Sequence, residues 1–383
     1  MSVDFEVSPD VLIWAEQQIT SKTDEQISSL LNKWIRKEEV PNTSSIRRVS
    51  KALRIPFGYF FLEYPPQEEC SLIHYRTIDS TANKNPSRNL VDIYNAMVNA
   101  QNWMSDYNRQ VLNLDSLPFV GNCSKNDSPV EVASSIRKEL DLPIDFFLGV
   151  KKTRYFHFLR DRISELGVLV MKNSVVGADN KRKLNIEEFR AFALVDSYAP
   201  LIFINSNDSE NGKIFSLVHE LAHILFGTDS LFNDNYSDKP VSNLEKICNA
   251  VAAEFLVPIS FFKSEWVKSK DVSFVKISSL ADMFHCSELV IARRALDLHF
   301  ISLDIYKEVL SRTKKQFEML QRANCYRTSR GGGDFYNTLK AKWDKNFVKA
   351  LDSSVKAGNT PYLDAYRLMG IKGSTFHKFM SMA

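Results

Sequence analysis

Apolar residues at helical spacing dominate the first part of the chain. They recur every three or four positions in three stretches between Pro9 and Leu62, which predicts short amphipathic helices. The pair Pro65-Pro66 ends this pattern, because proline lacks the amide hydrogen that a helix needs. Helical spacing returns over residues 89–112, and a Pro/Gly/Asn/Ser-rich stretch over residues 118–128 predicts a linker.

The middle of the chain mixes helical and strand patterns. Apolar spacing predicts helices over residues 130–140 and 156–166. Short β-type runs follow, with turn residues between them, at residues 168–171, 191–195 and 201–204. This order of elements favours an α+β unit.

Two apolar helices complete this unit. The first is predicted over residues 214–226, where Gly227 can end it as a left-handed residue. A polar, Asp/Asn/Ser-rich stretch separates it from the second helix, over residues 244–256, which Pro258 stops. Because helices outnumber strands, the predicted fold is α+β and mostly α.

The last part of the chain is helical and basic. Residues 275–300 resemble a small helix-turn-helix. Residues 307–349 carry eleven basic and four acidic side chains, a net charge of +7, with Gly331-Gly332-Gly333 as a hinge. The plain interpretation is a solvated helical face. An acidic protein or nucleic acid is the alternative partner, because aromatic residues lie nearby at Phe335, Tyr336 and Trp343.

Composition excludes several classes of protein. The chain has 383 residues, 44% of them hydrophobic, which is enough for two or three compact cores. Its net charge of only +3 argues against a protein that coats nucleic acid or an anionic membrane. The first ten residues lack a basic signal-peptide start, and no run of about 18 apolar residues occurs. We therefore expect a soluble cytoplasmic protein with no membrane partner.

Cysteine usage limits the kinds of metal site that are possible. The odd number and the absence of any C-x-x-C pair favour free thiols in a reducing compartment. The five cysteines are Cys70, Cys123, Cys248, Cys286 and Cys325. A metal site must therefore be built from histidines and carboxylates.

The strongest chemical signal is an H-E-x-x-H pattern at residues 219–223, inside a predicted helix. His219 and His223 are four residues apart, so they share a helix face and are close enough to bind one ion such as zinc. Glu220 lies one step round the helix, where it can take a proton from a metal-activated water without being a ligand. The alternative is a buried helix with two hydrogen-bonded core histidines. That alternative does not explain a glutamate among apolar neighbours.

The third metal ligand is expected from the helix over residues 244–256. Glu245 and Asn249 are again four residues apart, so one can bind the metal while the other hydrogen-bonds a ligating imidazole. Glu254 is the competing ligand, about half a turn round the helix from Glu245. Glu245 is preferred because it shares a face with the apolar positions of its helix, and the alternative for either glutamate is a solvated surface side chain.

These motifs resemble the ImmA/IrrE metallo-endopeptidases, of the zincin class. The resemblance rests on residues 215–225 and 245–258, is supported by residues 187–192 and 199–205, and covers roughly residues 130–300. It implies a small mixed sheet packed on a zincin-type active-site helix. It also implies His219, His223 and Glu245 as ligands of Zn²⁺ and Glu220 as the catalytic general acid/base.

The N-terminal unit resembles the Xre-type helix-turn-helix that precedes the peptidase in many of these proteins. The matching residues are Trp34, Pro41 and the stretches 9–15 and 53–61, although no glycine stands between Trp34 and Pro41. Residues 1–60 carry eight basic and eight acidic side chains, with the basic ones gathered after Lys33. DNA binding and protein docking both remain possible roles for this unit.

The motifs and resemblances together divide the chain into four predicted regions. They are a helix-turn-helix-like domain at 1–70, a helical connector and linker at 71–125, a zincin-like metallopeptidase domain at 126–305, and a basic helical region at 306–383. The predicted function is a zinc endopeptidase that makes a limited cut in a protein regulator, a repressor or antitoxin from its own operon. The alternative is a non-catalytic helix-turn-helix regulator or antitoxin with a residual or structural metal site.

Overall fold

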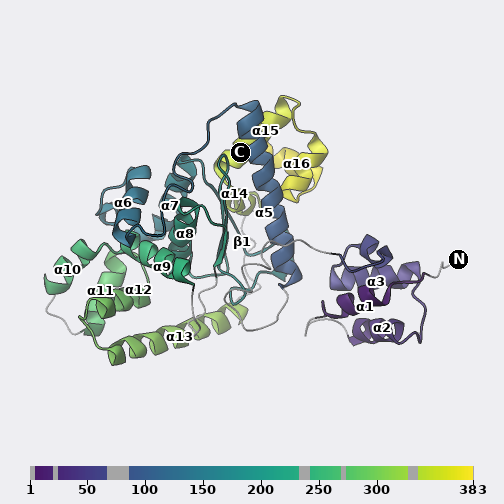
Figure 1. Ribbon diagram of the computed structural model, residues 1–383, viewed down its shortest axis with the longest axis horizontal. Coiled ribbons are helices and arrows are strands. Elements are labelled where there is room, and N and C mark those ends of the chain that lie inside the picture. Colours follow the sequence, from purple (N-terminus) through teal and green to yellow (C-terminus); the bar gives the residue numbers. More distant parts are fainter. Residues whose placement is uncertain are drawn as a thin grey trace. The chain divides into compact units, whose positions relative to one another are not determined.

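A computed structural model describes residues 5–19, 25–66, 86–232, 242–268, 273–326 and 335–382 (Figure 1). The chain divides into two compact units, Met1–Asp92 and Ile93–Ala383, so the division falls inside the predicted connector over residues 71–125. Most described residues are helical and a small mixed sheet is present, which confirms the predicted α+β, mostly α class. The predicted hinge over residues 331–333 lies outside the described residues.

The first unit is a small helical domain with its own core. It contains α1 (Pro9–Glu16), α2 (Glu25–Ile35), α3 (Thr43–Leu53) and the 3-10 helix η1 (Phe57–Phe61). Asn42 and Ser45 form a capping box at the start of α3. Lys37 has a φ of +61°, so a lysine takes the left-handed position in the turn that lacks a glycine.

The second unit is built around a four-stranded sheet with strand order β1-β5-β4-β6. Strand β1 (Leu169–Asn173) pairs in parallel with β5 (Leu201–Asn205), and β4 (Ala191–Leu194) pairs antiparallel with β5 and β6 (Ser230–Phe232). The three predicted β runs are confirmed. Strand β6 and the short pair β2 (Val175–Val176) and β3 (Asp179–Lys183) were not predicted, because they are short or polar.

Helices cover both faces of this sheet (Figure 1). Helices α7 (Tyr155–Glu165) and α8 (Glu210–Leu225) pack on one face, where β4 presents the small side chains of Ala191 and Ala193. The other face carries Phe192, whose ring lies 5.6 Å from that of Tyr94 in α5 (Arg88–Asp106). Small residues on one side of β4 thus let α8 approach the sheet closely. A π-helical turn, η2 (Tyr107–Val111), follows α5.

The remaining helices of the middle region pack around α8. Helix α9 lies against both α8 and α6. The bounds are α6 (Pro129–Glu139), α9 (Asn243–Leu256), α10 (Ile259–Lys268), α11 (Ser273–Met283), α12 (Glu288–Asp297) and α13 (Leu303–Tyr326), with 3-10 turns at η3 (Phe146–Gly149) and η4 (Lys152–Arg154). In the part of the chain that the structure describes, no single helix is long and apolar enough to cross a membrane, although the bent pair α9 and α10 passes by length and composition alone.

The stretch over residues 118–128, predicted as a linker, instead packs against the end of α8. The N–H groups of Gly121 and Cys123 donate to the carbonyls of Ile224 and Leu225, at 3.0 and 2.9 Å. Gly227 follows the helix with a φ of +67°, as predicted, and a Cβ there would lie 3.1 Å from the Cα of Gly121. Two glycines therefore let this stretch satisfy the last carbonyls of α8.

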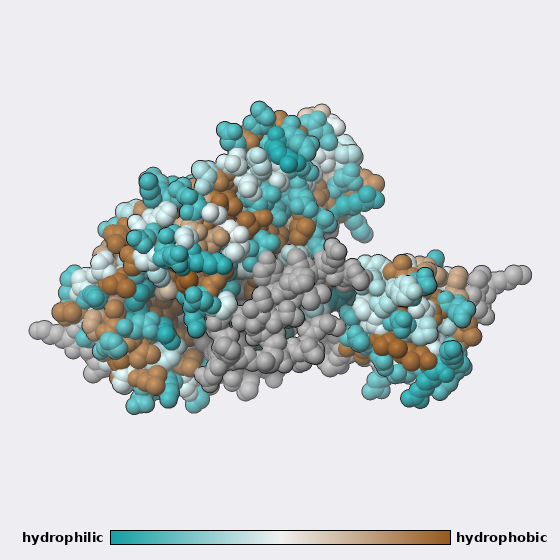
Figure 2. Space-filling model, viewed as in Figure 1, coloured by the Kyte–Doolittle hydropathy of each residue, from teal (hydrophilic) through white to brown (hydrophobic). Residues whose placement is uncertain are grey.

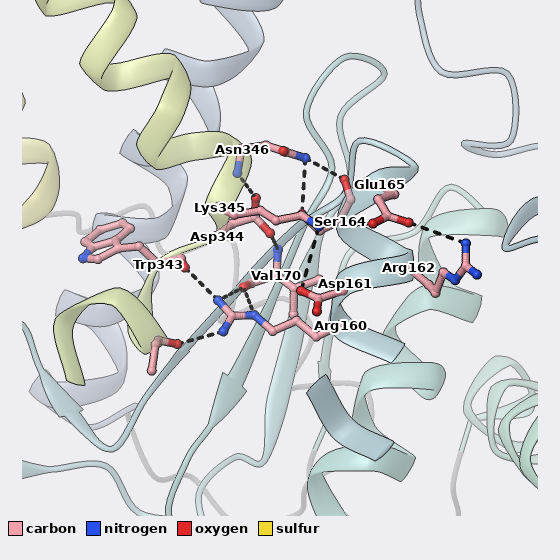
Figure 3. Close-up of polar contacts among 11 residues, drawn as sticks. Arg160, Asp161, Arg162, Ser164, Glu165, Val170, Trp343, Asp344, Lys345 and Asn346 are labelled. Carbon is pink, nitrogen blue, oxygen red and sulfur yellow. Dashed lines mark hydrogen bonds and ion pairs between the residues drawn. The ribbon is translucent and has the colours of Figure 1, made fainter. Parts of the chain in front are cut away.

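The C-terminal helices are joined to the sheet through Arg160 of α7 (Figure 3). Its guanidinium donates to the carbonyls of Val170 (2.9 and 3.1 Å), Ala341 (2.9 Å) and Trp343 (2.8 Å). Asp344 accepts from the N–H of Val170 at 3.2 Å. These contacts hydrogen-bond the N–H and C=O groups of Val170 at the outer edge of β1. Another strand therefore cannot pair with β1 at this position. The helices are α14 (Phe335–Lys342), α15 (Lys345–Lys356), α16 (Tyr362–Met369) and α17 (Gly373–Met380).

The packing of Trp343 corrects one interpretation of the basic segment over residues 307–349, in which this aromatic residue was available to a partner. Trp343 is only 9% exposed, and its ring stacks on Phe347 at 5.2 Å. It therefore belongs to the core and is not available to bind an acidic protein or nucleic acid. Phe335, in contrast, is half exposed.

Candidate metal centre

Helix α8 carries the H-E-x-x-H residues into the interior of the second unit. Ser209 caps the helix by accepting from the N–H of Gly212, and the stretch around Gly121 satisfies its far end. His219 and His223 lie one turn apart, so their imidazoles point the same way. Both histidines are buried, and so is Glu220 between them.

Glu245, in the first turn of α9, completes a cluster with the two histidines. Its Oε2 lies 3.0 Å from Nε2 of His219 and its Oε1 lies 3.2 Å from Nε2 of His223. The two Nε2 atoms are 3.2 Å apart. Ligand atoms that share one tetrahedral zinc ion at its usual bond lengths are about 3.3 Å apart. The spacing and the donor set therefore fit a single metal ion, and the structure brings together the three predicted ligands.

The protonation states of His219 and Glu245 suit a cation. For His223, burial lowers the pKa, but the hydrogen bond to Glu245 and the charges of Glu220 and Glu245 outweigh burial and raise it. Burial lowers the pKa of His219, which keeps its imidazole neutral near pH 7, and neutral imidazole is the form that binds a metal. Burial by itself would raise the pKa of Glu245, but hydrogen bonds from His219 and His223 outweigh it and the pKa lies below its ordinary value. Glu245 is therefore a carboxylate at neutral pH.

Asn249 supports the cluster from one turn further along α9. Its side chain hydrogen-bonds to that of His219, which raises the pKa of the imidazole and so opposes the effect of burial. The sequence predicted that one of Glu245 and Asn249 would bind the metal while the other hydrogen-bonds an imidazole. The contacts agree with that division, and a partner of this kind fixes the orientation of a ligating imidazole.

Glu220 lies beside the cluster and is fully buried. Its Oε2 accepts a hydrogen bond from the hydroxyl of Ser230, whereas its Oε1 has no partner among the described residues. Burial raises the pKa of Glu220 to about 8, although His223 and the Ser230 hydrogen bond act in the opposite direction. A half-satisfied buried carboxylate is costly to the fold, so its presence calls for a functional explanation.

Ser230 is the site residue that the sequence analysis missed. It lies in β6, is 4% exposed, and its oxygen also accepts from the N–H of Ala193 at 3.3 Å. That bond ties the serine to the sheet and fixes the hydroxyl that contacts Glu220. The residue belongs to a polar, Asp/Asn/Ser-rich stretch without periodicity, so the sequence contains no signal that distinguishes it from its neighbours.

Glu254, the competing third ligand, has a different role. Its Oε2 lies 3.1 Å from Nη2 of Arg294 in α12, and both carboxylate oxygens accept from the N–H of Ile259. The residue is 5% exposed, so it is neither a solvated surface side chain nor a member of the cluster. It joins α9 to α12.

The cluster reaches solvent on the Glu245 side. The Glu245 side chain is 22% exposed, whereas those of His219 and His223 are at most 2% exposed. A separate cavity of about 410 Å³ lies between α5 and α15 and contains none of these residues.

This geometry falls in the part of the chain that matches a known family. Residues 163–296 match the family model of the IrrE N-terminal-like domain. The match is to a metallopeptidase-type family, covers about a third of the chain, and includes His219, Glu220, His223 and Glu245. Residues 343–382 match a domain of unknown function, DUF8813. No curated protein matches the chain.

The IrrE-like region allows a direct test of the third ligand. Replacing Glu245 with Ala is expected to weaken zinc binding about 100-fold or more, because even outer-sphere partners of a metal contribute 10- to 100-fold. The matched variant Glu254→Gln is expected to bind zinc normally but to lose about 3 kcal/mol of stability, because it breaks a buried ion pair. Zinc affinity is measured by competition with a chelator and stability by urea unfolding. Normal zinc affinity in the Glu245 variant and weakened affinity in the Glu254 variant would show that Glu254 is the third ligand.

Proposed function

We propose that this protein is a zinc-dependent endopeptidase that makes a limited cut in a protein regulator, a repressor or antitoxin encoded in its own operon. The observation that carries this proposal is a cluster of three ligand side chains, in which each contact between donor atoms is 3.0–3.2 Å, beside a buried carboxylate whose Oε1 has no partner among the described residues. The match of residues 163–296 to a metallopeptidase-type family supports it.

The chemistry of peptide hydrolysis divides among the residues of the site. His219, His223 and Glu245 would hold zinc, which supplies a Lewis acid that polarises the scissile carbonyl and makes a water more acidic. With a cation held beside it, the pKa of Glu220 would fall below about 8, because a nearby positive charge favours the carboxylate. That carboxylate takes the proton of the attacking water and delivers it to the leaving amine. Ser230 holds Oε2 of Glu220, which leaves Oε1 free for this proton transfer.

The sheet has one edge that suits an extended substrate. The β1 edge is closed by Arg160 and Asp344, whereas β6 pairs only with β4 among the described residues. An extended peptide could therefore add to β6, next to Ser230 and Glu220, by main-chain hydrogen bonds. This arrangement favours a protein substrate that presents an exposed, unfolded segment, and it agrees with a limited cut.

The alternative is a non-catalytic regulator that keeps the metal for structural reasons. Structural zinc sites have four protein ligands. Here the described residues supply three ligands, His219, His223 and Glu245. Glu220 lies nearby, and its Oε1 has no hydrogen-bond partner among the described residues. This observation favours the enzyme over the structural site.

Coexpression with the protein encoded next door tests the proposal. We expect that protein to be shortened to two fragments, and we expect a chelator to stop the reaction in the purified mixture and added zinc to restore it. Mass spectrometry of the neighbouring protein measures the outcome. A full-length partner in the presence of the zinc-loaded protein would contradict the proposed substrate.

The N-terminal unit is proposed to bind DNA. The observation that favours this role is a group of exposed basic side chains on and just after α3, at Arg47, Arg48, Lys51 and Arg54. If this unit instead docks a protein, its binding does not depend on the charge of DNA phosphates. An affinity for the operon's promoter that does not change with ionic strength would therefore contradict DNA binding.

Ser230 is expected to position the catalytic carboxylate. Replacing Ser230 with Ala should leave the zinc content unchanged and lower the turnover number about 10- to 100-fold, because a displaced catalytic group loses its alignment. The matched control is Ser216→Ala, which removes from α8 a buried hydroxyl that has no hydrogen-bond partner among the described residues. Normal turnover in the Ser230 variant would show that the Ser230 hydroxyl has no part in the reaction.

A further inference from the structure

The last two helices of the chain form a tight helix-turn-helix arrangement. Three residues connect α16 (Tyr362–Met369) to α17 (Gly373–Met380), and the first of them, Gly370, has a φ of +62°. A short turn that contains a left-handed glycine is typical of this motif. The buried side chains on the two helices are Ala365, Met369, Phe376 and Phe379.

The two helices approach each other closely at the start of α17. A Cβ on Gly373 would lie 2.8 Å from the ring of Tyr366, so a glycine is required at this contact unless the ring moves. The Tyr366 ring also packs edge-on against Phe376 at 5.2 Å. The relative orientation of the helices is therefore fixed by packing.

This pair of helices is held on the core by α15 (Lys345–Lys356). Asp344 caps α15, and Phe347 and Leu351 are fully buried. The indole of Trp103 in α5 donates to the hydroxyl of Thr360, which lies just before α16, at 3.2 Å. A helix supported in this way can present its outer side to a rigid partner with little loss of entropy.

The outer side of α17 is polar and positively charged. Its exposed residues include Ser374, His377 and Lys378, and Lys372 precedes the helix as an exposed N-cap residue. The Lys372 side chain makes no capping hydrogen bond, so the positive end of the helix dipole is not neutralised there. The imidazole of His377 is oriented by the hydroxyl of Tyr366, 2.9 Å from its Nε2.

The charge around this surface favours a polyanion. Residues 335–382 carry eight basic and three acidic side chains, a net charge of +5. Figure 2 shows hydrophilic residues mixed with hydrophobic ones over α15 and α16. A protein-docking helix normally presents a central apolar patch, whereas the exposed residues of α17 up to Lys378 are polar or charged. The exposed apolar side chains nearby, Tyr362 and Leu363, lie in the first turn of α16.

We propose that α17 is a recognition helix that binds double-stranded DNA. The helix would enter the major groove with Ser374 and His377 toward the base edges, and Lys372 and Lys378 would contact the phosphates on either side. This site differs from the N-terminal unit, and it does not depend on the proposed peptidase activity.

The test uses the full-length protein with Arg47→Glu and Arg48→Glu, which reverses two of the three basic charges of α3. Its affinity for a fluorescent 30-base-pair duplex of random sequence is measured by anisotropy at several salt concentrations. Adding Lys372→Glu and Lys378→Glu is expected to weaken binding about 10-fold or more and to reduce the salt slope by about two. The matched control adds Lys138→Glu and Lys151→Glu, exposed lysines of the middle region, and should change the affinity less than about 2-fold. Thermal unfolding verifies that each variant is folded.

Recognition of a specific DNA sequence by α17 is tested separately, by selecting the duplexes that bind from the random pool. The α3 variant should enrich a defined sequence, and the same protein with Ser374→Ala and His377→Ala should not. The proposal is overturned if the α3 variant does not bind the duplex, if the control lysines matter as much as Lys372 and Lys378, or if single-stranded RNA of the same length binds more tightly. Equal enrichment by the Ser374/His377 variant would also overturn the proposed base contacts.

Discussion

Replacing Glu220 with Gln is expected to lower the rate of regulator cleavage by about 100- to 10,000-fold while the zinc content stays the same. The amide has nearly the same size, and its carbonyl oxygen can still accept the hydrogen bond from Ser230. It cannot, however, take a proton from water near neutral pH. The cluster of His219, His223 and Glu245 is unchanged by this substitution, so metal binding and catalysis are separated.

The measurements for this prediction are zinc content by atomic emission and the rate at which fragments appear. Glu139→Gln serves as the control, because Glu139 is an exposed glutamate at the end of α6 and its loss should not change the rate. If the Glu220 variant cuts at the wild-type rate, Glu220 is not the general base. If it loses zinc, the substitution has damaged the site and the rate carries no information on proton transfer.

Replacing Arg160 with Met is expected to lower the free energy of unfolding by about 3–5 kcal/mol. The guanidinium is buried and donates to three carbonyls, those of Val170, Ala341 and Trp343. Methionine fills a similar volume but donates nothing, so buried carbonyls lose charged donors and Asp344 loses a nearby positive charge. The loss is large because these bonds join α7, the edge of β1 and the segment that leads into α15 (Figure 3).

Arg162 provides a matched control two residues along the same helix. Its side chain is 40% exposed, forms a 3.7 Å ion pair with Glu165 and lies 5.7 Å from the ring centre of Phe158, so Arg162→Met should change stability by less than about 1 kcal/mol. Urea unfolding followed by circular dichroism measures both variants. Equal stability of the two variants would show that the C-terminal helices do not depend on Arg160 for their attachment.

The parts of the site that could be predicted from the sequence are those set by local geometry. The spacing of His219 and His223 places both on one helix face whatever surrounds them, and the same rule applies to Glu245 and Asn249. The ends of α8 and α9 were also predictable, because Gly227 and Pro258 act through their own backbone conformations. These predictions needed no knowledge of the rest of the chain.

The parts that could not be predicted depend on contacts between distant segments. Ser230 contacts Glu220 only because β6 pairs with β4, and a strand of three residues is too short to have a periodic signal. Arg160 gives no sign in the sequence that it will meet residues 341–343, more than 180 positions later along the chain. Helix geometry alone leaves Glu254 as a competing ligand, because it cannot show that Arg294 lies within reach of the Glu254 carboxylate.

The central claim is that the His219, His223 and Glu245 cluster, with Glu220, hydrolyses a peptide bond in a protein regulator. The most direct measurement is mass spectrometry of that regulator after incubation with the zinc-loaded protein in water enriched in oxygen-18. We expect two fragments, with one heavy oxygen atom in the new C-terminal carboxylate, and no fragments with the Glu220→Gln variant. Fragments without the heavy oxygen, or the same fragments from the Glu220→Gln variant, would contradict it.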